Sequence, residues 1–129
     1  MGPSAWLINS MWDAAFGIAP FFIPQVYIDF HDGNPGSGGT AAALPIDRQP
    51  AIFEREANGL WRTAGAPLEV FIDIPANDNR TITHISLHTA LDGGNWVINM
   101  VANQPIPVVL GDIMIASDLV RWAVADLVS

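Results

Sequence analysis

Residues 81–102 have the sequence TITHISLHTALDGGNWVINMVA, in which two runs of alternating side chains flank a glycine-rich turn. Side chains alternate between the two faces of a strand, so this pattern predicts two strands, each with one covered and one partly wet face. In the first run, Ile85 and Leu87 share one face, and two histidines and a serine share the other. The intervening Asp92-Gly93-Gly94 tolerates the positive φ that hairpin turns require. We therefore predict a central β-hairpin around which the other apolar runs pack.

Short apolar runs separated by turn signals lie on both sides of this hairpin. The further predicted strands cover residues 24–31, 48–55, 60–63, 67–74, 106–110, 113–116 and 119–127. The last of these runs also suits a helix. Short strands at regular spacing predict a mainly β fold, namely an antiparallel β-sandwich or a jelly-roll-like barrel with one short N-terminal helix. No linker divides the chain, so we expect residues 1–129 to form a single β-sandwich domain.

The N-terminal helix is expected over about residues 4–16, where Ser4 can cap the first turn and Gly17 can end the last. Apolar side chains recur there at helical spacing. They are Leu7, Ile8, Met11, Trp12, Ala15 and Phe16. A helix this short needs docking to be stable. It packs either on its own domain or on a neighbouring subunit, and the sequence leaves both possibilities open.

The composition is unusually apolar, since half of the 129 residues are hydrophobic and only 14% are charged. No run of about 18 apolar residues occurs, so membrane insertion is not expected. Burial between subunits is the natural outlet for the surplus apolar surface. We therefore expect a homo-oligomer, for example a trimer, or a part of a larger assembly.

The net charge of −8, with five arginines and no lysine, argues against a nucleic-acid partner. Such a partner requires clustered Lys and Arg to displace counterions from phosphates. The chain also contains no cysteine, which excludes disulfides, zinc ribbons and thiol catalysis.

The three histidines do not predict a metal site. His84 and His88 share a strand face but lie about 13 Å apart at the rise of a strand. Zinc needs ligand nitrogens about 2 Å away, so this pair cannot share one ion. The sequence therefore predicts surface or interface histidines, and at a subunit contact they would make assembly pH-sensitive.

Catalytic patterns are also weak. Ser86 and His88 are neighbours on one strand face, but no G-x-S-x-G elbow surrounds them. Asp29, Asp32 and Asp92 lack the spacing of a calcium loop. We predict no enzyme activity, no catalytic residue, no metal and no cofactor.

Two features favour contacts with other molecules instead. The glycine-rich segment 32–45 lacks the spacing of a phosphate-binding loop and is expected to be a mobile surface loop that orders against a partner. Most of the five tryptophans are expected in the core, whereas Trp61, next to a turn, is the best candidate for stacking on a sugar. The candidate interface residues are Trp6, Leu7, Met11, Trp12, Phe16, Phe21, Phe22 and Trp61.

The order of short motifs carries a family resemblance over about residues 7–126. These motifs are Arg48-Gln49, Ala57-Asn58-Gly59, Pro75-Ala76, residues 81–85, residues 92–94 and Gly111-Asp112, after an acidic glycine-rich loop. In this order they resemble small tail-fibre-like or minor tail virion proteins of tailed bacteriophages. The resemblance implies a β-rich structural subunit without catalytic residues, assembled symmetrically in the virion.

Our leading hypothesis is a minor tail or tail-fibre-like subunit of a tailed-phage virion, assembled in the host cytoplasm. Its partners would be further copies of itself and other virion proteins of the tail or capsid. One alternative is a capsid decoration protein that stabilises the head shell. Another is a carbohydrate-binding module that recognises a host-surface glycan through exposed aromatic side chains.

Overall fold

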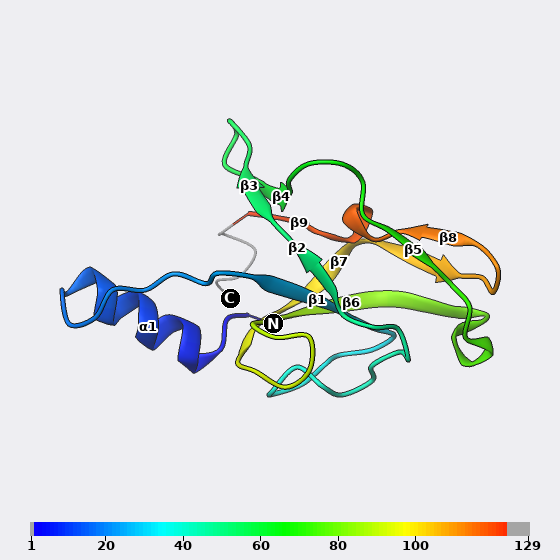
Figure 1. Ribbon diagram of the computed structural model, residues 1–129, viewed down its shortest axis with the longest axis horizontal. Helices are drawn as coiled ribbons and strands as arrows, with labels where there is room; N and C mark the ends of the chain where they lie inside the picture. Colours follow the sequence, from blue (N-terminus) through cyan, green and yellow to red (C-terminus); the bar gives the residue numbers. More distant parts are fainter. Residues whose placement is uncertain (1, 124–129) are drawn as a thin grey trace.

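The computed structural model describes residues 2–123 (Figure 1). Within this range the chain forms one α-helix, nine β-strands and two short 3-10 helices. In chain order they are α1 (Ala5–Ala15), β1 (Val26–His31), β2 (Gln49–Ala51), β3 (Phe53–Arg55), β4 (Trp61–Thr63), β5 (Glu69–Phe71), η1 (Pro75–Asn77), β6 (Arg80–His88), β7 (Trp96–Val108), β8 (Ile113–Ile115), η2 (Ala116–Leu119) and β9 (Arg121–Trp122). The expectation of a mainly β fold with one N-terminal helix is confirmed.

The strands form three separate antiparallel sheets. The largest has the order β2-β1-β6-β7, the second β3-β4-β9, and the third contains β5 and β8. No sheet in the described part of the chain closes on itself, so the predicted jelly-roll-like barrel was wrong, and three unequal sheets replace the two of a sandwich. The physical reason is length, because six of the nine strands have only two or three residues. Strands this short pair with one or two neighbours and cannot continue a closed sheet.

The predicted central hairpin is present as β6 and β7. Leu87 pairs with Ile98 and Ile85 with Met100, which places these side chains on one face. Strand β7 is longer than predicted, because the expected separate strand 106–110 continues β7 as far as Val108. A register shift between Ile82 and His84 absorbs extra β7 residues around Pro105. Such a bulge explains how one strand accommodates residues that would interrupt a regular ladder.

The core lies against one face of the large sheet. Ile28 and Phe30 of β1 pair with Leu87 and Ile85 of β6, and neither β1 side chain is exposed to solvent. This is the face predicted from the alternation in residues 24–31. The β5-β8 sheet, η2 and the residues next to them add further buried apolar side chains. These are Val70, Ile72, Met114, Ala116, Leu119 and Val120.

The opposite face of the large sheet is polar, yet it is also buried. It carries Asp29, His31, Ser86, His88 and Asn99, all of which are almost inaccessible to solvent. The sequence predicted that this face would be partly wet. The glycine-rich segment that follows β1 instead folds back over it, and its backbone pairs again with the end of β1.

Several local predictions are confirmed and others need correction. The Asn58-Gly59 turn is present, with Gly59 at φ +87°. The predicted strand 48–55 is interrupted at Ile52 and becomes β2 and β3. The predicted strand 119–127 is replaced at its start by η2, β9 contains only Arg121 and Trp122, and residues 124–127 lie outside the described residues.

Helix α1 forms as predicted, with Ser4 as its N-cap and Phe16 as its C-cap. The Ser4 hydroxyl accepts a hydrogen bond from Leu7 N at 3.1 Å. The residues just before the helix are held to β7, because Ser4 N donates to Val97 O and Asn99 N donates to Gly2 O. From this attachment the helix extends outward to one end of the molecule, whereas β5 and β8 form the opposite end (Figure 1).

Candidate functional site

The helix and the segment after it form an arm whose apolar side chains are largely exposed. All 11 residues of α1 remain at least partly exposed. Trp12 is 56% exposed, Phe16 72% and Phe22 80%. We call the exposed apolar side chains of this region the arm surface, defined as Ile8, Met11, Trp12, Phe16, Ile18 and Phe22. Exposed apolar side chains gathered in one segment mark interaction sites in folded proteins.

The candidate interface residues of the arm divide into two groups. Trp6 and Leu7 pack against the core, and the Trp6 ring meets Phe21 edge to face at 5.4 Å between centroids. These contacts fix the base of the arm. Met11, Trp12, Phe16 and Phe22 point away from the core and belong to the arm surface, where Trp12 and Phe16 stack at 5.3 Å. Ile8 and Ile18 were missed as candidates, although both lie in apolar stretches of the sequence.

Trp61 lies far from the arm and is only partly exposed. Its ring stacks on Trp122 with 6.1 Å between centroids, and Trp122 also meets Phe53 edge to face. These rings cover the inner side of the β3-β4-β9 sheet, while Arg62 and Arg121 lie on its other face. One flat face of Trp61 is therefore already occupied by a neighbouring ring.

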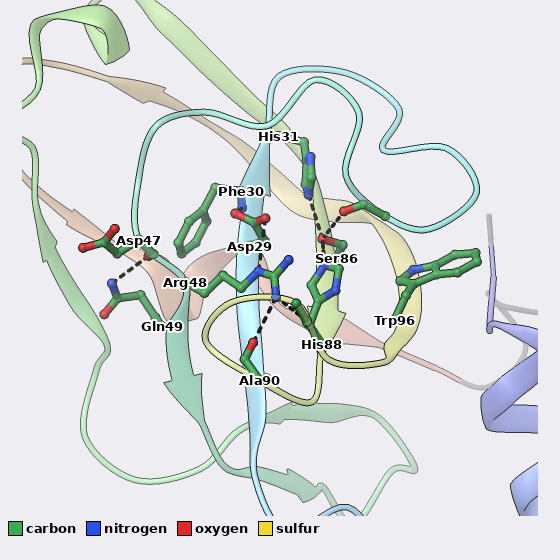
Figure 2. Close-up of polar contacts among 12 residues, drawn as sticks. Asp29, Phe30, His31, Asp47, Arg48, Gln49, Ser86, His88, Ala90 and Trp96 are labelled. Carbon is green, nitrogen blue, oxygen red and sulfur yellow. Dashed lines mark hydrogen bonds and ion pairs between the residues drawn. The ribbon is translucent and has the colours of Figure 1, made fainter.

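The glycine-rich loop is anchored at defined points on the buried polar face that carries His31, Ser86 and His88 (Figure 2). The Asn99 amide donates to Gly36 O at 2.7 Å and accepts from Trp96 Nε1 at 2.9 Å. Gly39 has φ +67°, and a Cβ atom there would lie 2.6 Å from Trp96 Cδ1. The loop is therefore docked on its own domain, which corrects the expectation of a mobile surface loop.

A chain of hydrogen bonds runs beneath this loop through His31, Ser86 and His88. His31 Nδ1 lies 2.8 Å from Ala41 O, and because a carbonyl oxygen only accepts, this nitrogen carries the proton. His31 Nε2 then accepts from the Ser86 hydroxyl at 2.7 Å. Ser86 Oγ in turn accepts from His88 Nε2 at 2.7 Å. Both imidazoles are neutral in this arrangement, and every contact in the chain has one donor and one acceptor.

Burial explains why these histidines stay neutral. Desolvation lowers the pKa of His31, opposed mainly by its hydrogen bond to Ala41 O. Desolvation also lowers the pKa of His88, to about 4, and the nearby Arg48 charge acts in the same direction. His84 is less buried, and desolvation lowers its pKa as well. The predicted surface location was therefore wrong for His31 and His88, which lie inside the domain.

The proximity of Ser86 and His88 does not make a catalytic site. The Ser86 side chain is fully buried, and its hydroxyl also lies within hydrogen-bond distance of Gly39 O in the covering loop. A substrate carbonyl cannot reach a sealed hydroxyl. Asp29 and Asp32, once considered for calcium, pair with Arg48 and Arg80. Within residues 2–123, no three metal-ligating side chains come together.

The described residues thus combine a β-rich body, an exposed apolar arm and a buried polar face. No helix in the described range is long and apolar enough to cross a membrane. The chain belongs to the family of the podophage GP4 fiber I protein gp80, whose family model matches residues 2–118. No curated protein matches this sequence.

The family match confirms the resemblance to tail-fibre-like virion proteins. The chain is a structural tail fibre subunit of a phage virion and not an enzyme. Membership of a fibre implies contacts with other virion proteins. It also places the protein in the tail fibre, so the alternative of a capsid decoration protein is not supported.

Proposed function

We propose that this fibre subunit contacts its neighbours through the arm surface and that it forms a homo-oligomer. The observation that carries this proposal is the exposure of Trp12, Phe16 and Phe22 on a segment that extends from the body of the molecule. Aromatic side chains contribute strongly to interfaces because they remove a large apolar area from water at low entropic cost. A closed trimer, the state considered from the sequence, is one arrangement that would cover the arm.

The size of the arm surface supports a stable contact. Its three exposed aromatic side chains present about 400 Å² of apolar area, and the aliphatic ones bring the total to about 700–800 Å². This is roughly what one partner contributes to a standard-size interface. The base of the arm is fixed by Ser4, Trp6 and Leu7, so little additional ordering is needed on binding.

The test is a pair of exposed substitutions, Trp12→Ser with Phe16→Ser, assayed by incorporation of the subunit into purified virions. We expect the folded variant to be lost from the virion fraction, because the apolar contact is removed while the core is untouched. The matched control is Leu91→Ser, which changes an exposed leucine in the hairpin turn. Normal incorporation of the arm variant would overturn the proposal.

Recognition of a host-surface glycan is a second candidate, and a polar groove favours it. This groove has a volume of about 600 Å³ and lies beside the β3-β4-β9 sheet. Its lining includes Arg62, Asn103, Gln104 and Arg121, whose planar guanidinium and amide groups can form hydrogen bonds with ligands. Binding to isolated host-surface glycans that weakens in Gln104→Ala but not in Leu91→Ser would support this role, and equal binding by both variants would count against it.

A further inference from the structure

A second exposed apolar surface lies at the end of the molecule opposite the arm. Phe71 of β5 pairs directly with Ile113 of β8, and the two side chains are 59% and 58% exposed. Ile74, Val109 and Leu110 are exposed in the adjoining turns. Backbone hydrogen bonds between Ile72 and residues 111–112 hold these turns together. We call Phe71, Ile74, Val109, Leu110 and Ile113 the tip surface.

Strand alternation explains why the tip surface exists. Val70 and Met114 point inward from the two strands and are buried, so their neighbours Phe71 and Ile113 must point outward. A two-stranded sheet has one face against the core and leaves the other to solvent. Threonine or a charged residue is the usual occupant of such an outer face, whereas here two large apolar side chains stand opposite each other.

We propose that the arm surface of one copy docks on the tip surface of a second copy, so that the chain assembles head to tail. This inference rests on the proposed function, because it names the surface that receives the arm. The two surfaces lie at opposite ends of one chain (Figure 1). A contact between two arms would leave every tip uncovered, whereas a head-to-tail contact covers one arm and one tip for each copy added.

The areas of the two surfaces are compatible with such a contact. The tip surface presents about 450 Å² of exposed apolar area. The aromatic side chains of the arm would contribute further apolar area from the other side of the contact. Together they approach the buried area of a small but specific protein interface. A heterologous contact of this kind forms a ring where its rotation closes and a filament where it does not.

Charge sets the conditions under which the contact forms. The arm carries the single charged residue Asp13 between Ser4 and Phe22, and the tip is bordered by Glu69, Asp73 and Asp112. Like charges at the edge of an apolar contact repel each other, and salt screens this repulsion. Head-to-tail assembly is therefore expected to strengthen with ionic strength.

The experiment uses two complementary variants of the full chain. The arm variant carries Trp12→Ser and Phe16→Ser, and the tip variant carries Phe71→Thr and Ile113→Thr, which preserve strand propensity. The control variant is Ile52→Thr, an exposed isoleucine outside both surfaces. Each protein is first checked for a native circular dichroism spectrum and cooperative unfolding. Light scattering behind a sizing column then gives its mass.

We expect the wild type and the control to form oligomers and each variant alone to remain at the monomer mass of 13.9 kDa. An equimolar mixture of the two variants should form a dimer of one copy of each and grow no further. The intact arm of the tip variant meets the intact tip of the arm variant, and the remaining ends are both defective. This complementation distinguishes a head-to-tail contact from any symmetric one.

Three results would overturn the inference. A tip variant that still forms wild-type oligomers would show that the arm docks elsewhere, and the proposed function would stand if the arm variant is lost from virions. Two monomeric variants that fail to combine would exclude an arm-to-tip contact. A monomeric wild type would exclude a contact between copies, and with it the proposed homo-oligomer; loss of the arm variant from virions would then assign the arm to a contact with another virion protein.

Discussion

The guanidinium of Arg48 donates to the carbonyl oxygen of Gly93 across 2.9 Å and so ties the start of β2 to the turn of the central hairpin. The same Nη1 atom donates to Ala90 O at 3.0 Å, and Nε lies 3.4 Å from Asp29 Oδ2 (Figure 2). One nearly buried cation thus joins three segments that are far apart in the sequence. Arg48 belongs to the Arg48-Gln49 motif, so these contacts give the arginine of that motif a structural role.

Replacement of Arg48 by methionine should lower the free energy of unfolding by about 3 kcal/mol. Methionine keeps the apolar stem but leaves the buried Asp29 carboxylate without its cation. Urea unfolding followed by tryptophan fluorescence measures the loss. Arg62→Met is the control, because Arg62 pairs with Glu54 and Glu56 at the surface, where a loss below about 1 kcal/mol is expected. Equal losses in the two variants would contradict the role of Arg48.

Gly39→Ala should be far more damaging than Gly38→Ala. Both glycines have positive φ, so each substitution carries a backbone cost of about 1–2 kcal/mol. At Gly38 the new Cβ meets nothing within 4 Å, but at Gly39 it collides with the Trp96 ring. Gly39→Ala is therefore expected to release the glycine-rich loop from the large sheet as well. Hydrogen exchange of the amides in residues 36–44 would detect this release, and similar protection in both variants would refute it.

Ser86→Ala should destabilise the domain by about 2 kcal/mol. The Ser86 hydroxyl contacts both His31 Nε2 and His88 Nε2, so its removal leaves two buried nitrogens without this partner. Ser117→Ala is the comparison, because it removes a single, less buried hydrogen bond from Leu68 N. Thermal unfolding of the two variants should rank Ser86→Ala as the less stable one. The reverse order would argue against a stabilising role of the histidine chain.

Stability should decrease as the pH falls from about 6.5 to about 4. The pKa of His88 is 6.5 in the unfolded chain and about 4 in the folded one, so between these values the unfolded state binds more protons. The contribution is complete above pH 6.5 and is lost on acidification, on the order of 3 kcal/mol for His88. The lowered pKa of His31 acts in the same direction.

The pH dependence can be assigned by substitution. Three charged or titratable groups face His88. Arg48 and His31 lower its pKa, and Asp29 raises it. His88→Gln should flatten the decline in unfolding free energy between pH 6.5 and 4, whereas the less buried His84→Gln should change it little. Chemical unfolding at a series of pH values tests both variants. An unchanged slope in His88→Gln would remove His88 as the source.

Local sequence signals predicted much of the fold. Period-two alternation identified β1, β5, β6 and the first half of β7, because each of these strands presents one apolar face to the core. The capping residue Ser4 and Gly17 located the helix to within one residue. Phe71 alternates with the buried Val70 and shares its face with Glu69, a pattern that indicates exposure, but it was not among the candidate interface residues. Alternation along a strand therefore also identifies an apolar side chain that faces solvent.

Contacts between distant segments were not predictable in this way. A glycine-rich loop has the same composition whether it is solvated or docked, and docking here depends on the approach of Gly39 to Trp96. The meeting of His31 and Ser86 depends on β1 pairing with β6 in one register. The stacking of Trp61 on Trp122 likewise requires β4 and β9 to pair. Periodicity states which face a residue occupies, but not what covers that face.

The outer strands of the large sheet carry features that oppose amyloid-like growth. Edge strand β2 contains Pro50, and edge strand β7 contains Pro105 and Pro107, none of which has an N–H to offer a foreign strand. Gly2 and Ser4 already occupy hydrogen-bonding positions along β7. A subunit made in many copies within one infected cell is crowded with identical chains. Blunted edges disfavour fusion of the large sheets of neighbouring chains, so such chains can accumulate without joining through these strands.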